Sequence, residues 1–263
     1  MRWPRTSLAR VTARVVRRVG CGEPFGCDHI LDPAMWPKTP AELIRVQQEL
    51  ASRRPAPWRP VGPRPLIAGC FVCFAHGVRG RGRAEEPCWA AAAVMRADRQ
   101  LAGTAIVRGE ARAAYEPGLL ALREGPLLES AVRALPARPE VIIANATGHD
   151  HPRGAGLALH LGAALELPSI GVTDRPLMAH AEDTAAERGA TNPLLLEGVE
   201  VARLLRTRVG ARPLVIHAGW RTDLDTAVAV VLASIRRART PEPLRRARRE
   251  ARRARAAEEN RLR

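Results

Sequence analysis

Lysine, aromatic residues and long apolar runs are all scarce in this chain of 263 residues. Lys38 is the only lysine, and aromatic residues make up 3% of the sequence. So few rings argue against a broad platform for single-stranded nucleic acid, because such a surface stacks successive bases on aromatic side chains. No run of 18 apolar residues occurs, so the sequence predicts no membrane-spanning helix.

Cysteines are also sparse, and their number is odd: Cys21, Cys27, Cys70, Cys73 and Cys88. Such a set is typical of reduced thiols in a cytoplasmic protein. Cys70 and Cys73 form a CxxC pair, but they lie in an apolar run that predicts a β-strand. Positions i and i+3 of a strand point to opposite faces, so this pair is a weak candidate for a zinc or redox site. The same holds for Cys21, Cys27 and His29.

Positive charge is what the chain has in excess. Lysine and arginine number 42 against 27 acidic residues, which gives a formal net charge of +15 and an isoelectric point near 11.3. Such a surface attracts polyanions, with nucleic acid first and an anionic membrane second. A GC-rich coding sequence also produces an arginine-rich, lysine-poor protein without any ligand. Because the arginines cluster, we expect nucleic acid as the partner.

Three segments are predicted. Residues 1–34 form a variable basic extension, which could also be a transit peptide or lie upstream of a true start at Met35. Residues 35–240 form the main domain, and the hydrophobic fraction of 46% is enough for a sizeable core. Residues 241–263 form a basic tail that can be helical. The tail is either solvated or an arm on phosphates, whose affinity would fall steeply with salt.

Within the main domain, apolar runs predict buried strands over 66–74, 88–95, 104–107, 140–144, 169–172 and 214–217. Helical spacing predicts helices over 118–135, 151–165 and 222–238, and Thr39 caps another that ends at Ala51. The order gives an α/β fold with a mixed sheet, an antiparallel meander followed by parallel crossovers. This is a ribonuclease H-like arrangement flanked by helices.

Four segments carry a family resemblance: 115–124 (YEPGLLALRE), 148–153 (GHDHPR) continuing to 160–162 (HLG), 205–208 (LRTR) and 241–243 (PEP). In this order and spacing they resemble the endonuclease V family, which cuts one phosphodiester bond past a deaminated adenine. The similarity runs from about residue 36 to 247. It implies a Mg²⁺- or Mn²⁺-dependent nuclease of inosine repair, acting on DNA or RNA.

The resemblance also assigns residues to substrate binding. Tyr115 corresponds to a wedge that replaces a lost stacking neighbour when a base is turned out. Five residues would form or support the pocket for that base: Leu120, Gly148, His151, Arg153 and Gly156. Pro152 suits the first turn of a helix, whose free N–H groups favour an anion. Ordinary structural roles, a half-buried aromatic and a glycine turn, remain alternatives.

Two features beside these residues limit the resemblance. Glu116 follows Tyr115 where the family has a hydrophobic residue, and a carboxylate there would weaken contact with phosphate. Arg206 and Arg208 either contact phosphate or belong to the plain surface.

The catalytic positions depart furthest from the family. Glu124 keeps the family's glutamate, but Phe71 and Asn145 stand where the resemblance implies aspartates. Asp174 stands in place of a lysine, and Trp220 in place of a histidine. Mg²⁺ binds best to negatively charged oxygen ligands. Glu124 and Asn145 provide only one negative charge, so they would hold a metal weakly or not at all.

Three hypotheses follow. The first is an endonuclease V-like protein that binds nucleic acid with lost or impaired cleavage. The second is an active deoxyinosine-specific endonuclease in which either other residues correspond to the family's catalytic positions or the metal site differs. Candidates for a different metal site are His149, Asp150, His217 and Asp223. The third is a protein-interaction scaffold.

Overall fold

One mixed sheet organises the described part of the chain. The structure is a computed structural model that describes residues 36–77, 82–96 and 100–261, so the predictions for residues 1–34 lie outside the described residues. The sheet has eight strands in the order β3-β2-β1-β4-β5-β8-β7-β6. They are β1 (Leu66–Phe74), β2 (Pro87–Arg96), β3 (Leu101–Glu110), β4 (Val141–Ala144), β5 (Ser169–Thr173), β6 (Thr191–Leu196), β7 (Val199–Leu205) and β8 (Leu214–Ala218).

Strand pairing confirms the predicted meander and crossovers. β1, β2 and β3 pair antiparallel, whereas β1, β4 and β5 pair parallel. Beyond β5 the sheet continues antiparallel through β8, β7 and β6. In the parallel pair at the centre, Cys70 of β1 lies opposite Ala144 of β4. The carboxyl ends of β1, β4 and β5 therefore open at the same side of the sheet, where doubly wound folds place ligands.

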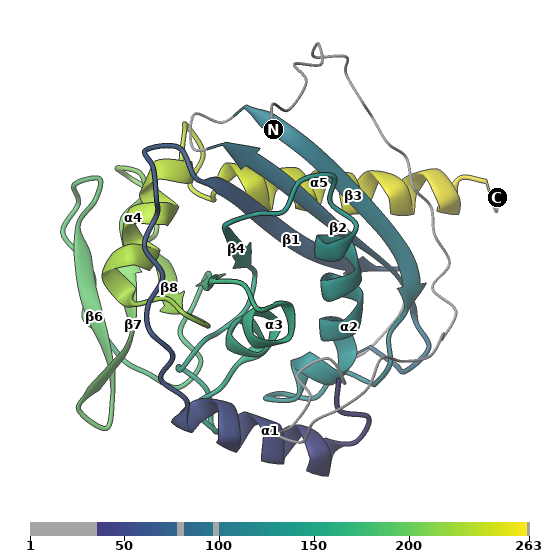
Figure 1. Cartoon of the computed structure of the whole chain (residues 1–263), viewed down its shortest axis with the longest axis horizontal. Coiled ribbons are helices and arrows are strands. Elements are labelled where there is room, and N and C mark those ends of the chain that lie inside the picture. The colour runs from purple at the N-terminus through teal and green to yellow at the C-terminus, as the bar shows by residue number, and fades with distance from the viewer. Residues whose placement is uncertain (1–35, 78–81, 97–99, 262–263) are drawn as a thin grey trace, which may run out of the picture.

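Helices cover both faces of this sheet (Figure 1). On one face lie α1 (Pro40–Ser52), α2 (Leu120–Arg133) and α3 (Leu157–Leu165), and on the other lie α4 (Leu224–Ser234) and α5 (Glu242–Glu259). α2 and α3 contact each other, α4 packs on β7 and β8, and α5 crosses β1 and β2. The fold is thus the α/β arrangement that the sequence predicts.

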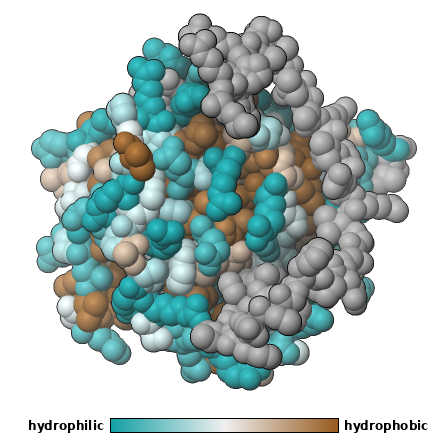
Figure 2. All heavy atoms as spheres, in the orientation of Figure 1, coloured by the Kyte–Doolittle hydropathy of each residue, from teal (hydrophilic) through white to brown (hydrophobic). Residues whose placement is uncertain are grey.

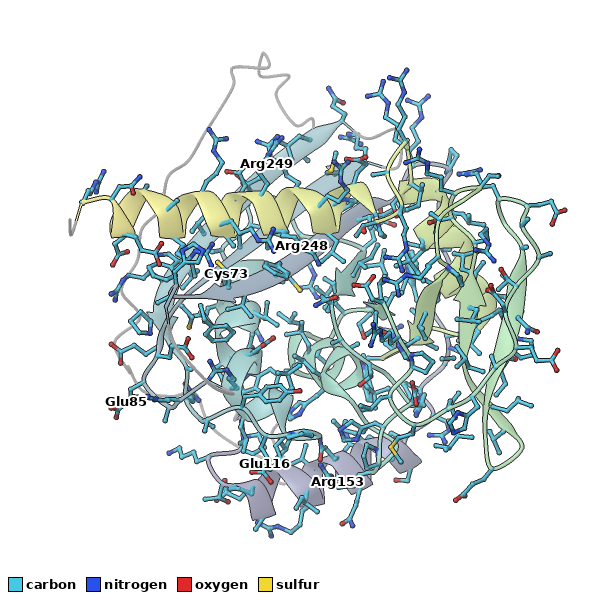
Figure 3. The ribbon with its side chains drawn as sticks, turned by 180° about the vertical axis from the view of Figure 1, so that it is seen from behind. Cys73, Glu85, Glu116, Arg153, Arg248 and Arg249 are labelled. Atoms are coloured by element: carbon cyan, nitrogen blue, oxygen red, sulfur yellow. The ribbon has the colours of Figure 1, made fainter. Side chains whose placement is uncertain are left out.

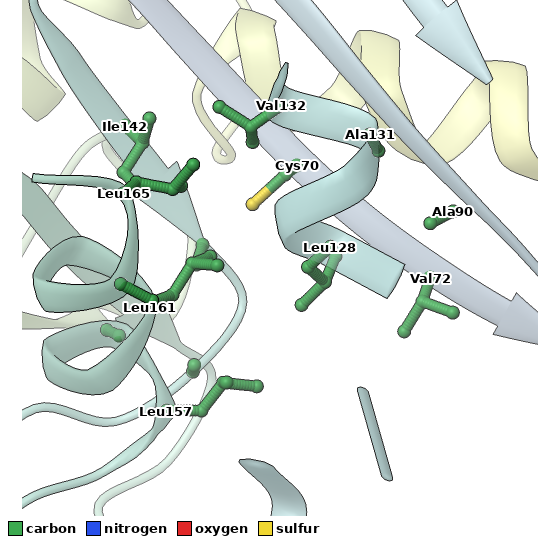
Figure 4. Close-up of a cluster of buried hydrophobic side chains, with 14 of the residues drawn as sticks. Cys70, Val72, Ala90, Leu128, Ala131, Val132, Ile142, Leu157, Leu161 and Leu165 are labelled. Atoms are coloured by element: carbon green, nitrogen blue, oxygen red, sulfur yellow. The ribbon is translucent and has the colours of Figure 1, made fainter. Parts of the chain in front are cut away.

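The alternation of side chains along β1 separates two cores. Cys70 and Val72 point to the α2–α3 face, where they join Leu128, Leu161 and others (Figure 4). Cys73 points to the opposite face and packs with Trp89 and Ala251. The two thiols of the CxxC pair are therefore on different sides of the sheet, as predicted, and both are free.

The helix α5 belongs to the sheet's cover. Its buried residues are Pro243, Leu244, Ala247 and Ala251, a stripe of mostly small side chains at helical spacing. A Cβ added to Gly69 of β1 would lie 2.2 Å from the backbone nitrogen of Leu244. The helix α5 and the strand β1 are therefore so close that only glycine fits at position 69. The helical prediction for the tail is confirmed, but a freely solvated tail is contradicted by this packing.

Two sequence predictions of structure need correction. The helix expected from His151 begins only at Leu157, because residues 151–154 form turns and Gly154 has a φ of +67°. Pro152 therefore opens no helix. The hairpin β6–β7 was also missed, although its two-residue turn Glu197–Gly198 has the positive φ angles (52° and 80°) that such turns require.

Figure 2 shows polar side chains interleaved with apolar ones on the face seen in Figure 1. Within the described residues, no helix has both the length and the apolar character that a membrane crossing requires.

Candidate functional site

Two of the expected site residues lie just beyond the carboxyl ends of the central strands. Asn145 directly follows β4 and is exposed, and Asp174 directly follows β5. Since Cys70 pairs with Ala144, Asn145 emerges beside Phe71. A cavity of about 90 Å³ opens here. Its lining residues are Asn145, Val172, Thr173, Asp174, Leu214, Arg239, Thr240, Leu244 and Arg248.

An arginine of α5 occupies the position that faces Phe71. The guanidinium carbon of Arg248 lies 4.9 Å from the centre of the Phe71 ring, and that of Arg252 lies 6.0 Å away. Figure 3 shows Arg248 on the side of α5 toward the sheet and Arg249 on the opposite side. The Nε atom of Arg248 is buried without a hydrogen-bond partner. Burial and the neighbouring Arg252 lower its pKa from the ordinary value.

The negative charge of Asp174 is balanced locally. Its carboxylate pairs with the Nη1 atom of Arg239. Arg239 is fixed in turn by bonds from Nε to the carbonyl of Arg212 (2.6 Å) and from Nη2 to the carbonyl of Pro213 (2.7 Å). The cavity thus holds one anion, Asp174, and two cations, because Arg248 also lines it and interacts with the charge of Asp174.

Glu124 of α2 is half-buried and close enough to Cys70 to raise the pKa of that thiol. Desolvation raises the pKa of Glu124 to about 7, although the charge of Arg123 opposes the shift. No hydrogen bond among the described residues involves its carboxylate. Arg123, the nearest cation along the helix, is paired with Glu86 instead. Glu124 is therefore a carboxylate without a partner beside the first strand.

This donor set does not fit Mg²⁺. Phe71 has no lone pair, Asn145 offers one neutral carbonyl oxygen, and Glu124 supplies one carboxylate, whereas Mg²⁺ selects oxygen ligands. Arg248 adds a positive charge beside Phe71 and Asn145, whereas Glu124 lies next to Cys70, which points to the opposite face of β1. Across the described residues, no group of three or more histidine, cysteine or acidic side chains is placed to hold a metal ion.

The residues proposed as alternative metal ligands have other roles in the fold. Asp150 is fully buried and accepts hydrogen bonds from three backbone N–H groups, those of Leu177, Met178 and Ala179. Asp223 caps α4 by accepting a bond from the N–H of Thr226 (2.8 Å). Burial lowers the pKa of His217 to about 4. Asp150 and Asp223 are thus used within the fold, and His217 lies buried in β8 with the charges of Asp150 and His149 nearby.

Trp220 lies apart from the cavity. It packs with Leu50 and Leu159 between α1 and α3, and its backbone N–H donates to the Oγ atom of Ser169 (2.8 Å). The structure therefore groups Phe71, Asn145 and Asp174, but it does not bring Trp220 to them.

Arg248 is the residue of this site that the sequence did not single out. It was one of many arginines in the C-terminal stretch. The available signal was the apolar spacing of Leu244, Ala247 and Ala251, which marks the buried stripe of a helix and places Arg248 at its edge.

A second group of site residues converges on one carbonyl oxygen. The carbonyl of Gly118 accepts bonds from Gln47 Nε2 (3.0 Å) and Arg153 Nη2 (2.6 Å), and His151 Nε2 lies 3.1 Å away. Arg153 Nε also donates to Gln47 Oε1 (2.5 Å). Burial and the charge of Arg153 lower the pKa of His151 to about 4, so the neutral ring faces Gly118. This network joins α1, the start of α2 and the 148–156 loop.

Gly148 lets that loop approach β8 closely, and Gly156 lets it fold tightly on itself. A Cβ at Gly148 would lie 2.3 Å from the carbonyl oxygen of Ala218, and one at Gly156 would lie 2.3 Å from Thr147 Oγ1. The N–H of Gly156 donates to the carbonyl of Gly148 (2.7 Å). The loop is therefore compact, and its backbone approaches its neighbours as a close-fitting pocket requires.

Tyr115 precedes Gly118 in the chain, and its backbone N–H donates to the carbonyl of Gly82 (3.3 Å). Its side chain is 43% exposed, which is unusual for a large ring and leaves it available for stacking. Glu116 beside it is exposed, and Leu120 is half-buried. The segment is anchored by Arg123, which donates from Nη1 to the carbonyls of Arg83 (2.7 Å) and Ala113 (2.8 Å).

The two arginines after β7 differ from each other. Arg206 donates to the carbonyls of Thr184, Ala185 and Ala211 and pairs with Asp183. Its donors are therefore used within the fold. Arg208 is exposed.

Comparison with known proteins matches both the fold and the sequence. The family model of endonuclease V matches residues 61–249. Endonuclease V of Streptomyces avermitilis is 40% identical over 82% of this chain and 92% of the relative. Its crystal structure superposes with a TM-score of 0.75 over 84% of this chain and 95% of the other.

Two other solved structures are similar. Endonuclease V of Bacillus subtilis is 25% identical with a TM-score of 0.78, over 88% of this chain and 98% of the other. Endonuclease V of Ciona intestinalis, solved with a 24mer DNA containing an inosine followed by a ribo-adenosine, is 18% identical with a TM-score of 0.68, over 81% and 96%. The latter shows likeness of fold. With the family model matching most of its length and a relative at 40% identity, the chain belongs to the endonuclease V family.

Proposed function

We propose that this protein binds nucleic acid at inosine-type sites and cleaves the phosphodiester bond poorly or not at all. The observation that carries the proposal is the contact between Phe71 of β1 and Arg248 of α5. Metal-dependent hydrolysis requires oxygen ligands at this position, and an apolar ring and a cation occupy it instead.

The missing carboxylates remove two contributions to catalysis. A metal ion would activate water and neutralise charge on the phosphate, and each contribution requires negatively charged ligands. Glu124 remains, but with a pKa of about 7 a large fraction is protonated at neutral pH, which further weakens its hold on a cation. Asp174 adds negative charge near the position of the phosphate, partly offset by Arg239.

The binding side supports recognition of a turned-out base. Tyr115 is exposed for stacking, and Gly148 lies in a compact loop braced by His151 and Arg153. Enzymes that act on a base read it by stacking and by hydrogen bonds to its edge after turning it out of the helix. The net charge of +15 favours any nucleic-acid partner.

A single-turnover assay tests the proposal directly. An end-labelled strand with one deoxyinosine is incubated with the protein in Mn²⁺, beside the Streptomyces avermitilis relative as a positive control and a Glu124→Ala variant. We expect no cut from this protein while a gel shift shows the strand bound. A cut one bond past the inosine that disappears in the variant would establish an active endonuclease.

A second experiment tests which residues prevent a divalent metal from binding at this site. Phe71→Asp with Asn145→Asp restores two carboxylates, but Arg248 would pair with the new side chain at 71. We therefore expect Mn²⁺ binding by calorimetry to be weak in the double variant and clearly stronger when Arg248→Ala is added. Equal affinities in the two variants would mean that Arg248 does not control the site.

A further inference from the structure

The buried Nε atom of the Arg248 guanidinium has no hydrogen-bond acceptor among the described residues. The guanidinium stacks over Phe71, an arrangement that holds a cation in place through the ring's negative face. Among the described residues, no ion pair or hydrogen bond involves this side chain, whereas its neighbours Arg246 and Arg249 both contact Glu250. A buried donor left unpaired is costly, so the site calls for an external acceptor.

The cavity around Arg248 suits one anionic group. Its volume of about 90 Å³ admits a group of several atoms. Thr240 and the exposed amide of Asn145 line it and offer further donors. The opposing charge is Asp174, and Arg239 pairs with it. Arg248 and the more distant Arg252 therefore leave a net positive charge at the end of β1.

We propose that Arg248 binds a phosphate group of the nucleic acid in this cavity, so that the protein holds its target without a divalent metal. In a metal-dependent nuclease a bound ion neutralises the phosphate and also activates water. Here a guanidinium attached to α5 performs the first task and cannot perform the second. The inference rests on the proposed function and specifies how the degenerate site contacts its ligand.

The test measures binding and not cleavage. Fluorescence anisotropy follows a labelled single strand with one deoxyinosine, in EDTA and in Mg²⁺. We expect the wild-type affinity to agree within about twofold in the two conditions. Arg248→Gln, which keeps most of the stem that packs on Phe71, should weaken binding roughly tenfold, as expected for a lost charge-assisted hydrogen bond. The slope of log affinity against log salt should fall by about one.

Arg249→Gln is the matched control, because it removes the same charge from the same helix on the opposite, exposed side. We expect it to change affinity less than twofold. Arg248→Ala removes both the guanidinium and the stem that packs on Phe71, whereas Arg248→Gln removes only the guanidinium. Thermal melting of the two variants shows how much stability the packing contributes, so that an effect on binding can be assigned to the lost donor.

The outcomes separate the two proposals. Equal effects of Arg248→Gln and Arg249→Gln, or wild-type binding that needs Mg²⁺, would overturn the role of Arg248 and leave inosine binding intact. Absence of wild-type binding in both conditions would instead overturn the proposed function itself.

Discussion

The polar groups around Gly118 have hydrogen-bond partners within the protein, whereas one group on each face of β1 near Phe71 lacks them in the described part of the chain. Around Gly118, the side chains of Gln47, His151 and Arg153 all converge on one carbonyl oxygen. On the two faces of β1, Glu124 beside Cys70 makes no hydrogen bond to a described residue, and the buried Nε atom of Arg248 over Phe71 has no partner there. The first group contributes to the fold even without a ligand, because its bonds join three segments. The residues of the second group gain hydrogen-bond partners only when a ligand binds, so substitutions there should cost little stability.

The largest expected effect tests the anchor of the Tyr115 segment. Glu86→Ala leaves Arg123, which is only 4% exposed, as a buried cation without its carboxylate. Breaking a buried pair in this way costs about 4 kcal/mol. Urea unfolding should show this loss, and Arg133→Ala, which removes a surface-exposed partner of Glu129, should cost less than 1 kcal/mol. Similar losses in both variants would mean that burial does not distinguish them.

A pH-dependent effect tests the second group. Glu124 has a pKa of about 7 when folded and 4.5 as its ordinary value, so between these values the folded state binds more protons. The free energy of unfolding should therefore fall as pH rises from 4.5 through 7, by up to about 3 kcal/mol.

Glu124→Gln removes that titration and provides the control. Urea unfolding in EDTA at pH 5 and pH 8 should show the fall in the wild type and not in the variant. The same pH dependence in both proteins would place the titration on another group.

Arg153→Ala tests the first group at the loop itself. The variant loses the bonds to Gly118 and Gln47, and we expect a loss of stability of about 2 kcal/mol. Oligonucleotide binding should weaken as well, because the Gly148 loop is no longer braced. If stability falls while affinity is unchanged, the network serves the fold alone.

The smallest effect concerns recognition. Tyr115→Ala should leave stability nearly unchanged, because the ring is exposed, and reduce the preference for inosine over adenosine by about 1 kcal/mol. Competition between matched strands in an anisotropy assay measures this preference. Tyr115→Phe should retain it, since the ring remains.

Much of the fold follows from local sequence. β1, β4, β5 and β8 are short apolar runs, and their order already implies a mixed sheet. The convergence of Phe71, Asn145 and Asp174 also follows, because each lies at or just beyond a neighbouring strand. The start of α3 was misplaced since the turns at 151–154 depend on contacts with other segments. β6–β7 was missed because Pro193 interrupts the strand pattern.

Arg248 illustrates what sequence alone does not predict. Its place over Phe71 depends on how closely α5 approaches β1 at Gly69, a contact between distant parts of the chain. The apolar spacing of Leu244, Ala247 and Ala251 puts Arg248 at the edge of the buried stripe, but only the packing of the helix shows that this arginine faces the cavity.

The position of α5 has a consequence for biosynthesis. The strands β1–β3 leave the ribosome early, yet the helix that covers one of their faces is made near the end. Until then Phe71, Trp89 and Ile106 present an apolar surface on the nascent chain. Exposed strand faces of this kind promote aggregation. We expect a chain that stops before Glu242 to depend on chaperones and to accumulate in the insoluble fraction of the cell.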